Sequence, residues 1–206
     1  TLINRYCWSE RHGFYYDCFA RSSADCHHNL LANKTAASFW AIISGVANDS
    51  QLSRLVNMIC NPEEFWTEHP VPTLAKSDPN YTPFGGYWLG SVWAPTNYMI
   101  VRGLQERGCS MLAREIAFKH IKAMAAVMND QNYGGIWECY SPEYMRPATR
   151  ENGGAVRENF VGWSGLGPIS MMIETILGFE FNALANTVSW TVREKEPHGI
   201  ESLKFN

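Results

Sequence analysis

The sequence of 206 residues lacks the features that mark several classes of protein. No apolar run approaches the roughly 18 residues that a membrane-spanning helix needs. The formal net charge of −3 provides no basic excess for nucleic acid or an anionic lipid surface. We therefore predict no membrane segment and no nucleic-acid partner. Residues 1–5 carry neither an initiator Met nor a signal-peptide pattern, as expected of a chain that starts within a domain.

The six cysteines form no CxxC pair and follow no regular spacing. A disulfide framework is not expected in a chain long enough to build its own core. Cys26, His27 and His28 are adjacent, but adjacent residues rarely converge on one ion, and no second cluster completes four ligands. We predict no metal site and no cofactor.

Aromatic residues are abundant, with eight tryptophans in the chain. Four of these lie near Gly or Pro, at the ends of predicted elements: Trp88, Trp93, Trp137 and Trp163. Aromatic rings on loops above a rigid scaffold are typical of carbohydrate clefts. The alternative is that these large rings fill the core of the domain.

Apolar spacing predicts helical hairpins over most of the chain. A short strand is predicted at 14–19, then helices at 36–45, from an N-cap at Asp49 to 59, at 92–107, at 110–128 and at 167–177. The inward positions are 112, 116, 117, 121, 124 and 128 in the fourth helix, and 169, 172, 173 and 176 in the last. Two long loops rich in Gly, Pro and aromatics, 61–90 and 129–162, connect these helices. Loops of this length are usually functional, and the alternation of short turns with long loops favours an all-α toroid whose active face is made of the loops.

The pattern changes to period two after Gly178. Val188, Trp190 and Val192 alternate with polar residues, 197–199 forms a turn signal, and Leu203 and Phe205 alternate beyond it. We predict a small β-hairpin from these segments, and a division into a helical part at 1–180 and a β-rich part at 181–206.

Glu138 lies between two large rings in the sequence Trp137-Glu138-Cys139-Tyr140, which follows a Gly-Gly pair. Sugars stack their C–H faces on aromatic rings, and cleavage of a glycosidic bond uses carboxyl groups. The segment therefore has the composition of a sugar site with a catalytic carboxylate. Taken alone, however, the segment favours an ordinary surface glutamate beside two core aromatics.

A second aromatic cluster covers residues 85–98. Trp93 and Asn97 are four residues apart near the start of a predicted helix, so that both project from one face. A ring beside an amide can stack on a sugar and bind its hydroxyls. The alternative is that Asn97 satisfies loop backbone groups and Trp93 belongs to the core.

Several motifs in order resemble glycoside hydrolase family 63 and its relatives. They are Tyr-Trp-x-Gly-x-x-Trp-x-Pro-x-Asn-Tyr at 87–98, Trp-Glu-x-Tyr at 137–140 and Phe-x-Gly-Trp-Ser at 160–164. The relatives include processing α-glucosidases, bacterial mannosylglycerate hydrolases and, more distantly, trehalases. Segments 13–17, 61–66, 70–74 and 196–199 resemble the bacterial branch. The resemblance covers nearly the whole chain.

This resemblance implies part of an (α/α)6 toroid and an inverting glycosidase that acts on an α-glucoside or α-mannoside. Glu138 would be the general base that deprotonates the attacking water. The residues expected at the sugar site are Tyr87, Trp88, Gly90, Trp93, Asn97, Trp137, Tyr140 and Trp163.

The chain departs from the family pattern in three places. Leu89 replaces a common Arg, and Ala94-Pro95 replaces Pro-Pro. The family's general acid is an Asp well over a hundred residues before the base, and no Asp here lies in such a loop motif. With about five helices where six hairpins need twelve, the chain is expected to be the C-terminal half of the toroid, partnered by the missing N-terminal half.

Two other functions remain open. The chain could be a non-catalytic sugar-binding or structural module that lacks the second carboxylate. It could also perform phosphorolysis, for which Arg146, Arg150 and Arg157 are the nearby basic candidates. Other carboxylates in the Glu138 loop are Glu143, Glu151 and Glu158, none of them with an aromatic on both sides. Lys34 and His120 receive no predicted role.

Overall fold

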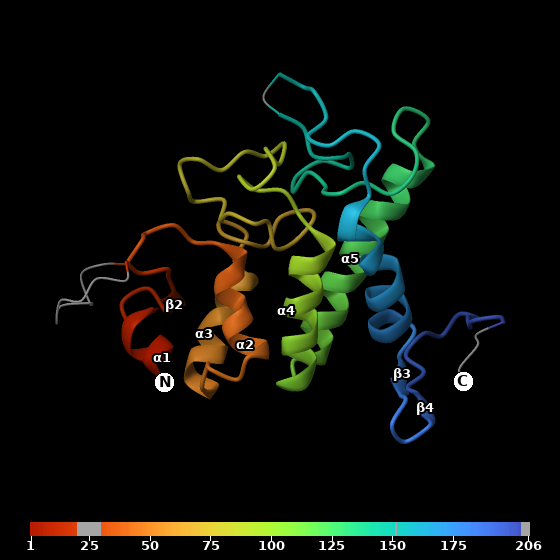
Figure 1. Ribbon diagram of the computed structural model, residues 1–206, viewed down its shortest axis with the longest axis horizontal. Coiled ribbons are helices and arrows are strands. Elements are labelled where there is room, and N and C mark those ends of the chain that lie inside the picture. The colour runs from red at the N-terminus through yellow and green to blue at the C-terminus, as the bar shows by residue number, and fades with distance from the viewer. Residues whose placement is uncertain (20–29, 151, 203–206) are drawn as a thin grey trace.

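The computed structural model describes residues 1–19, 30–150 and 152–202, and it is mostly helical with two small β-hairpins (Figure 1). The elements in order are α1 (Leu2–Tyr6), β1 (Trp8–Ser9), β2 (Phe14–Tyr15), the 3-10 helix η2 (Ala36–Phe39), α2 (Trp40–Ile43), α3 (Asp49–Ile59), α4 (Ala94–Glu106), α5 (Ser110–Asn129), the 3-10 helix η3 (Gly162–Gly165), the π-helix η4 (Gly167–Ile176), β3 (Phe179–Asn182) and β4 (Thr187–Trp190). Cys26, His27 and His28 lie outside the described residues. No helix within the described ranges has the length and apolarity that crossing a bilayer requires.

The helices begin and end close to where the sequence predicts. Helix α3 has Asn48 as its N-cap and not Asp49, so the predicted cap is one residue too late. Asn48 and Gln51 form a capping box, in which each side chain accepts a hydrogen bond from the other's backbone N–H at 2.9 Å. Pro95 occupies the first turn of α4, where its missing N–H costs nothing.

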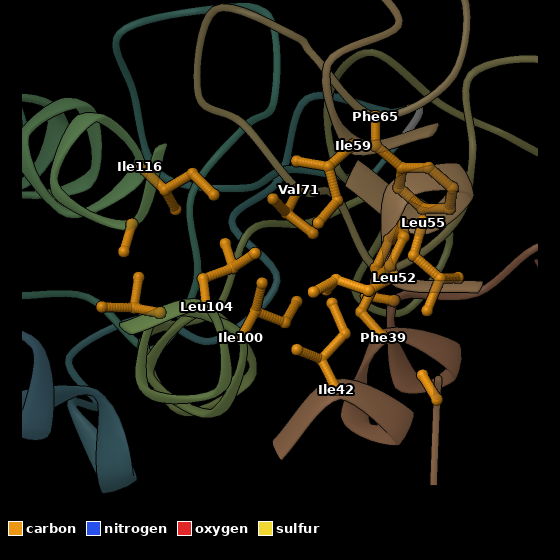
Figure 2. Close-up of a cluster of buried hydrophobic side chains, with 14 of the residues drawn as sticks. Phe39, Ile42, Leu52, Leu55, Ile59, Phe65, Val71, Ile100, Leu104 and Ile116 are labelled. Carbon is orange, nitrogen blue, oxygen red and sulfur yellow. The ribbon is translucent and has the colours of Figure 1, made fainter. Parts of the chain in front are cut away.

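The main core lies between α2, α3, α4 and α5 and extends to the β1–β2 hairpin (Figure 2). Phe14, Phe39 and Phe65 form a fully buried aromatic cluster, with ring centroids 5.4 Å apart between Phe14 and Phe39 and 4.8 Å between Phe39 and Phe65. The apolar side of α3 joins this cluster through Leu55 and Ile59, as its spacing predicts. The predicted strand at 14–19 is shorter than expected, because only Phe14–Tyr15 pairs with β1.

The last two helices bury somewhat different faces from those predicted. In η4, Ile176 is buried as expected, but Ile169 and Met172 are exposed, and Met171 and Thr175 are buried instead. The prediction assumed 3.6 residues per turn, whereas a π-helix winds more widely because its hydrogen bonds join residues five apart. In α5, the predicted Ile116, Ala117 and Met124 are buried, and Met128 near the end of the helix is exposed.

The C-terminal hairpin pairs β4 with the preceding strand β3. The sequence predicted that β4 pairs with residues that follow the turn signal at 197–199, and that prediction is wrong. Phe179 lies opposite Trp190, and Asn182 opposite Thr187, with the turn at 183–186. Residues 197–199 therefore do not form the hairpin turn, and Leu203 and Phe205 lie outside the described residues. The stacking of Phe179 on Trp190, with centroids 4.8 Å apart, stabilises this register.

The two long loops lie together at one end of the helices, and the β3–β4 hairpin lies at the other end (Figure 1). Val92 and Tyr140 join the loops as an antiparallel pair whose N–H···O bonds measure 2.9 and 3.0 Å. A second connection links Gly85 to Thr149, whose carbonyl accepts from Gly86 N–H at 3.1 Å. These long-range hydrogen bonds hold the two irregular loops against each other.

Buried polar side chains fasten the loops to each other and to the helices below them. His69 donates from Nδ1 to the main-chain carbonyl of Ser141, and its own N–H bonds to Pro142 O at 2.9 Å. The Asn97 amide on α4 donates to Pro70 O at 3.1 Å and contacts His120 Nδ1 on α5 at 3.2 Å. The side-chain bonds to Ser141 and Pro70 satisfy loop carbonyls, which are costly to bury without a partner.

His120 is fully buried and must be neutral. Because the Asn97 amide is a donor, Nδ1 of His120 accepts and its proton sits on Nε2. Burial, followed by the proximity of His69, lowers the pKa of His120 from 6.5 to about 3. A residue that the sequence leaves without a role is thus part of the support for the loops.

Helix α4 approaches α2 closely at Gly103, and we predict that Gly103→Ala destabilises the fold. An added Cβ would lie 2.7 Å from Ile43 N and 3.0 Å from Ile43 Cα. Overpacking of this kind costs about 1–3 kcal/mol, which outweighs the gain of about 1 kcal/mol in helix propensity. Urea unfolding measures the difference. Gly165→Ala is the control, because its Cβ meets only Val161 Cγ1 at 3.9 Å, and equal stability of both variants would contradict the prediction.

Because the folded state keeps His120 neutral, we predict that stability decreases as the pH falls below about 6.5. The unfolded chain takes up a proton there that the folded chain excludes down to about pH 3, which costs up to about 1.4 kcal/mol per pH unit. Urea unfolding at pH 7 and pH 5.5 should show a smaller loss in His120→Gln than in the original chain. His12→Gln, at an exposed position, should behave like the original chain.

Candidate functional site

The segment 137–140 forms a turn around its own tyrosine. Tyr140 is 1% exposed and packs against Met124 and Val127 of α5, while its hydroxyl accepts the N–H of Trp137 at 3.0 Å. Trp137 is partly buried, and its indole N–H donates to Gly134 O at 2.9 Å. Tyr140 is therefore buried as a core residue in this structure.

Glu138 is 6% exposed, which is rare for a glutamate. Its Oε2 is buried and receives no hydrogen bond from the described residues. Arg157 Nε lies 3.7 Å from this oxygen. The main-chain carbonyl of Glu138 accepts a hydrogen bond from the hydroxyl of Ser164, the residue after Trp163. Glu138 is thus contacted by residues from two later segments, one at its side chain and one at its backbone.

Aromatic rings form a layered cluster beside this segment. Trp88 stacks on Trp93, with centroids 4.2 Å apart and planes 5° from parallel, and Tyr87 meets Trp93 edge-on at 5.1 Å. Trp163 contacts Trp93 edge-on at 6.1 Å. Trp93 is 1% exposed, whereas Trp88 and Trp163 are 45% and 55% exposed. Trp93 is the buried floor of the cluster, and the two exposed rings are the available platforms.

Gly90 contributes through its backbone. Its φ of 140° is a conformation that favours glycine, and an added Cβ would lie 2.9 Å from Thr82 O. Tyr87 also has a left-handed φ of 67°, which is uncommon for a tyrosine and indicates a constrained turn. The turn at 87–90 presents Trp88 to solvent.

The predicted site residues fall into two groups. Tyr87, Trp88, Trp137 and Trp163 are exposed or partly exposed. Those that are buried in this structure are Gly90, Trp93, Asn97 and Tyr140. For Trp93 and Asn97 the structure thus matches the core alternative, since Asn97 is 0% exposed and its amide is engaged by Pro70 and His120.

The alternative carboxylates and cations have other surroundings. Glu143 accepts from Tyr81 OH at 2.9 Å and pairs with Lys76 at 3.6 Å, while Glu158 is exposed and Glu151 lies outside the described residues. The Arg146 guanidinium lies over Phe84 and Tyr144, at 4.8 and 5.0 Å from their ring centroids. Only Arg157, of the three arginines considered, pairs with Glu138 within the described part of the chain.

Cys139 adjoins Glu138, and its thiol is buried. Burial raises the pKa of its thiol to about 12, so that the reactive thiolate is not populated near neutral pH. Its 3% exposed side chain packs with Trp93, Ala148 and Val156. In the described ranges, no three His, Cys, Asp or Glu side chains are grouped to hold a metal ion.

A cavity of about 780 Å³ lies away from this site, between α4 and the β3–β4 hairpin. Tyr98, Arg102 and Glu174 are among its lining residues. None of the residues that line it belongs to the Glu138 segment or to the aromatic cluster. Its size alone therefore assigns it no part in the chemistry.

The contacts of Ser164, Arg157 and His69 with the loop around Glu138 are not evident from the sequence. Each joins segments that are 19 to 72 residues apart. The only sequence signals are that Ser164 follows Trp163 in a Gly-Trp-Ser motif, and that Arg157 is a basic residue of the same loop.

Comparison with known proteins identifies relatives of this chain. Residues 1–152 match the family described as the mannosylglycerate hydrolase MGH1-like glycoside hydrolase domain. A protein of Borreliella burgdorferi is 31% identical over 98% of this chain and 42% of its own length. Mannosylglycerate hydrolase from Thermus thermophilus is 26% identical over 66% of this chain and 29% of its own length. The cytosolic neutral trehalase of Kluyveromyces lactis is 27% identical over 63% of the chain and 17% of its length.

Solved structures share the fold over part of their length. The glycoside hydrolase family 63 mannosylglycerate hydrolase from Thermus thermophilus, in complex with Tris, superposes with a TM-score of 0.59 at 23% identity, covering 81% of this chain and 34% of its own. Neutral trehalase from Saccharomyces cerevisiae has a TM-score of 0.63 at 18% identity, covering 83% and 28%. The chain therefore spans less than half the length of these relatives. On the match over residues 1–152, it belongs to the MGH1-like glycoside hydrolase family.

Proposed function

We propose that this chain is part of an inverting glycoside hydrolase that acts on α-glucosides or α-mannosides, with Glu138 as the general base. The observation that carries the proposal is a buried carboxylate held beside exposed tryptophans, in a chain that belongs to a glycoside hydrolase family. The family implies a carbohydrate substrate. The printed names of relatives, a mannosylglycerate hydrolase and a trehalase among them, support α-mannosides and α-glucosides.

In the proposed reaction, Glu138 removes a proton from a water molecule that attacks the anomeric carbon. A second carboxylic acid protonates the departing oxygen from the other side of the sugar. The two carboxyl groups of an inverting enzyme stand about 6.5–9.5 Å apart, which leaves room for the water. We propose that the acid is an Asp supplied by the part of the protein that this chain does not include.

The exposed apolar residues support the proposal that this chain is part of a larger toroid. Met111 and Phe118 on α5 are 89% and 49% exposed, and Ile169 on η4 is 61% exposed. Large apolar side chains on helices ordinarily pack against another element. In the proposed (α/α)6 arrangement, the missing N-terminal half supplies further helical hairpins.

The proposed sugar contacts are the exposed rings. Trp88 presents one face to solvent while Trp93 covers the other, so that it can stack on a sugar without a change of rotamer. Trp163, close to Glu138 through Ser164, is a second platform. Tyr87 and Trp137 flank these positions, and Gly90, Trp93, Asn97 and Tyr140 support them from below.

A non-catalytic carbohydrate-binding or structural role is the second candidate. The observation that favours it is the pairing of Glu138 with Arg157 together with its low exposure, because a buried ion pair can serve structure alone. The aromatic platforms would then bind sugar without cleaving it.

We predict that Glu138→Gln in the full-length protein lowers kcat by at least about 100-fold, because general acid–base catalysis contributes roughly 10²–10⁴-fold. The amide keeps the shape of the side chain and removes the proton acceptor. The rate of hydrolysis of α-mannosides and α-glucosides is measured from the amount of sugar that is released. Glu158→Gln, at an exposed position in the same loop, is the matched control and should retain activity.

The outcome separates the two candidates. Near-wild-type turnover of Glu138→Gln would contradict the role of general base, and sugar binding without any hydrolysis by the full-length protein would favour the second candidate. Proton NMR of the released sugar tests the inverting mechanism, since an α-glycoside should first give the β anomer.

We predict that Trp88→Ala in the full-length protein weakens substrate binding by about 1–3 kcal/mol, within the range expected for loss of an aromatic platform. The effect should appear as a higher KM, and Trp88→Phe should retain most of the affinity because a ring remains. Equal KM values for Trp88→Ala and the original protein would contradict this placement.

A further inference from the structure

Arg157 is the cation that faces the Glu138 carboxylate. Its Nε lies 3.7 Å from Oε2, too far for a hydrogen bond but within the range of an ion pair. Oε2 itself is buried and has no hydrogen-bond donor among the described residues. Burying an uncompensated carboxylate oxygen is costly, so Arg157 supplies the charge that makes this placement of Glu138 tolerable.

The loop that carries Arg157 is fixed on both sides of it. Just before Arg157, Val156 is buried in the cluster with Trp93, and its N–H bonds to Ala148 O at 3.1 Å. After Arg157, the hydroxyl of Ser164 binds the carbonyl of Glu138. The loop is therefore attached to the Trp93 floor and to Glu138 itself.

The guanidinium also has a defined orientation. The carbon of the guanidinium lies 4.4 Å from the ring centroid of Phe160, which is a cation–π arrangement. The Arg157 side chain is 47% exposed, whereas that of Glu138 is 8% exposed. The Arg157 side chain therefore extends from solvent to the buried carboxylate of Glu138.

We propose that Arg157 is a positioning residue that engages Oε2 of Glu138 and leaves Oε1 to take the proton from the attacking water. This inference rests on the proposed role of Glu138 as general base. The pair makes the two carboxylate oxygens unequal, one bound by charge and the other directed at the reaction. Because a displacement of about 1 Å can cost about 100-fold in rate, the orientation of the carboxylate has a direct effect on kcat.

The test compares Arg157→Gln, Arg157→Lys and Arg157→Ala in the full-length protein. Arg157→Gln should lower kcat at least about tenfold and leave KM within about threefold, since Arg157 acts on the base and not on the sugar. Arg157→Lys should recover part of kcat, and added guanidinium ion should partly restore Arg157→Ala. Arg150→Gln is the matched control at an exposed position of the same loop and should match the original protein.

Coupling to Glu138 distinguishes positioning from general support of the fold. If Arg157 acts through Glu138, the double variant Glu138→Gln with Arg157→Gln should be no slower than Glu138→Gln alone. Thermal unfolding shows whether each variant is folded, and the guanidinium rescue is read on folded Arg157→Ala; if that variant does not fold, Arg157→Lys provides the comparison.

Three results would overturn the inference. One is a wild-type kcat for Arg157→Gln, another is a raised KM at unchanged kcat, which would make Arg157 a substrate contact, and the third is a double variant slower than Glu138→Gln. Retained activity of Glu138→Gln would instead defeat the proposed function and the role of Arg157 with it. If Glu138→Gln loses activity and Arg157→Gln keeps the original kcat, only the proposed role of Arg157 is contradicted.

Discussion

Two hydrogen bonds between Val92 and Tyr140 determine where the candidate site residues of this chain lie. They pair the end of one long loop with the middle of another, 48 residues further along the sequence, at 2.9 and 3.0 Å. Val92 directly precedes Trp93 and α4, and Tyr140 follows Glu138 by two residues. The pairing therefore brings the aromatic cluster and the carboxylate to the same end of the helices, which neither loop achieves alone.

The pairing depends on what lies beneath it. Tyr140 fills the space above α5, and its hydroxyl closes the turn that contains Glu138. Asn97 and His120, on adjacent helices, are buried under the loops and hold the carbonyl of Pro70 through the Asn97 amide. The order of support runs from the helices to the buried polar groups, then to the backbone pairing, and finally to Glu138 and the exposed tryptophans. Four of the residues expected as sugar contacts from the sequence are thus buried in this structure: Gly90, Trp93, Asn97 and Tyr140.

Local patterns predicted the helices well, because the capping and apolar spacing of α3, α4 and α5 are properties of short segments. The ordered motifs also indicated the family correctly, since the matched region extends over residues 1–152. Burial inside the loops was not predictable in this way. Whether Trp93 or Trp88 is exposed depends on a stack between rings five residues apart and on the left-handed turn at Tyr87. The register of the β3–β4 hairpin and the wider winding of η4 likewise depend on tertiary packing.

Both interpretations of Glu138, catalytic and structural, depend on one contact, that between its Oε2 and Arg157 Nε. A glutamate that served structure alone would gain most from donors at both oxygens, since a buried carboxylate is stabilised by several hydrogen bonds. Here Oε2 has only a half-exposed arginine at ion-pair distance and no hydrogen bond from the described residues. Such an arrangement offsets only part of the cost of burying the carboxylate, but it fixes the direction of the carboxylate while leaving it under-coordinated. An under-coordinated, oriented carboxylate is what a general base requires, and this favours catalysis over a purely structural role.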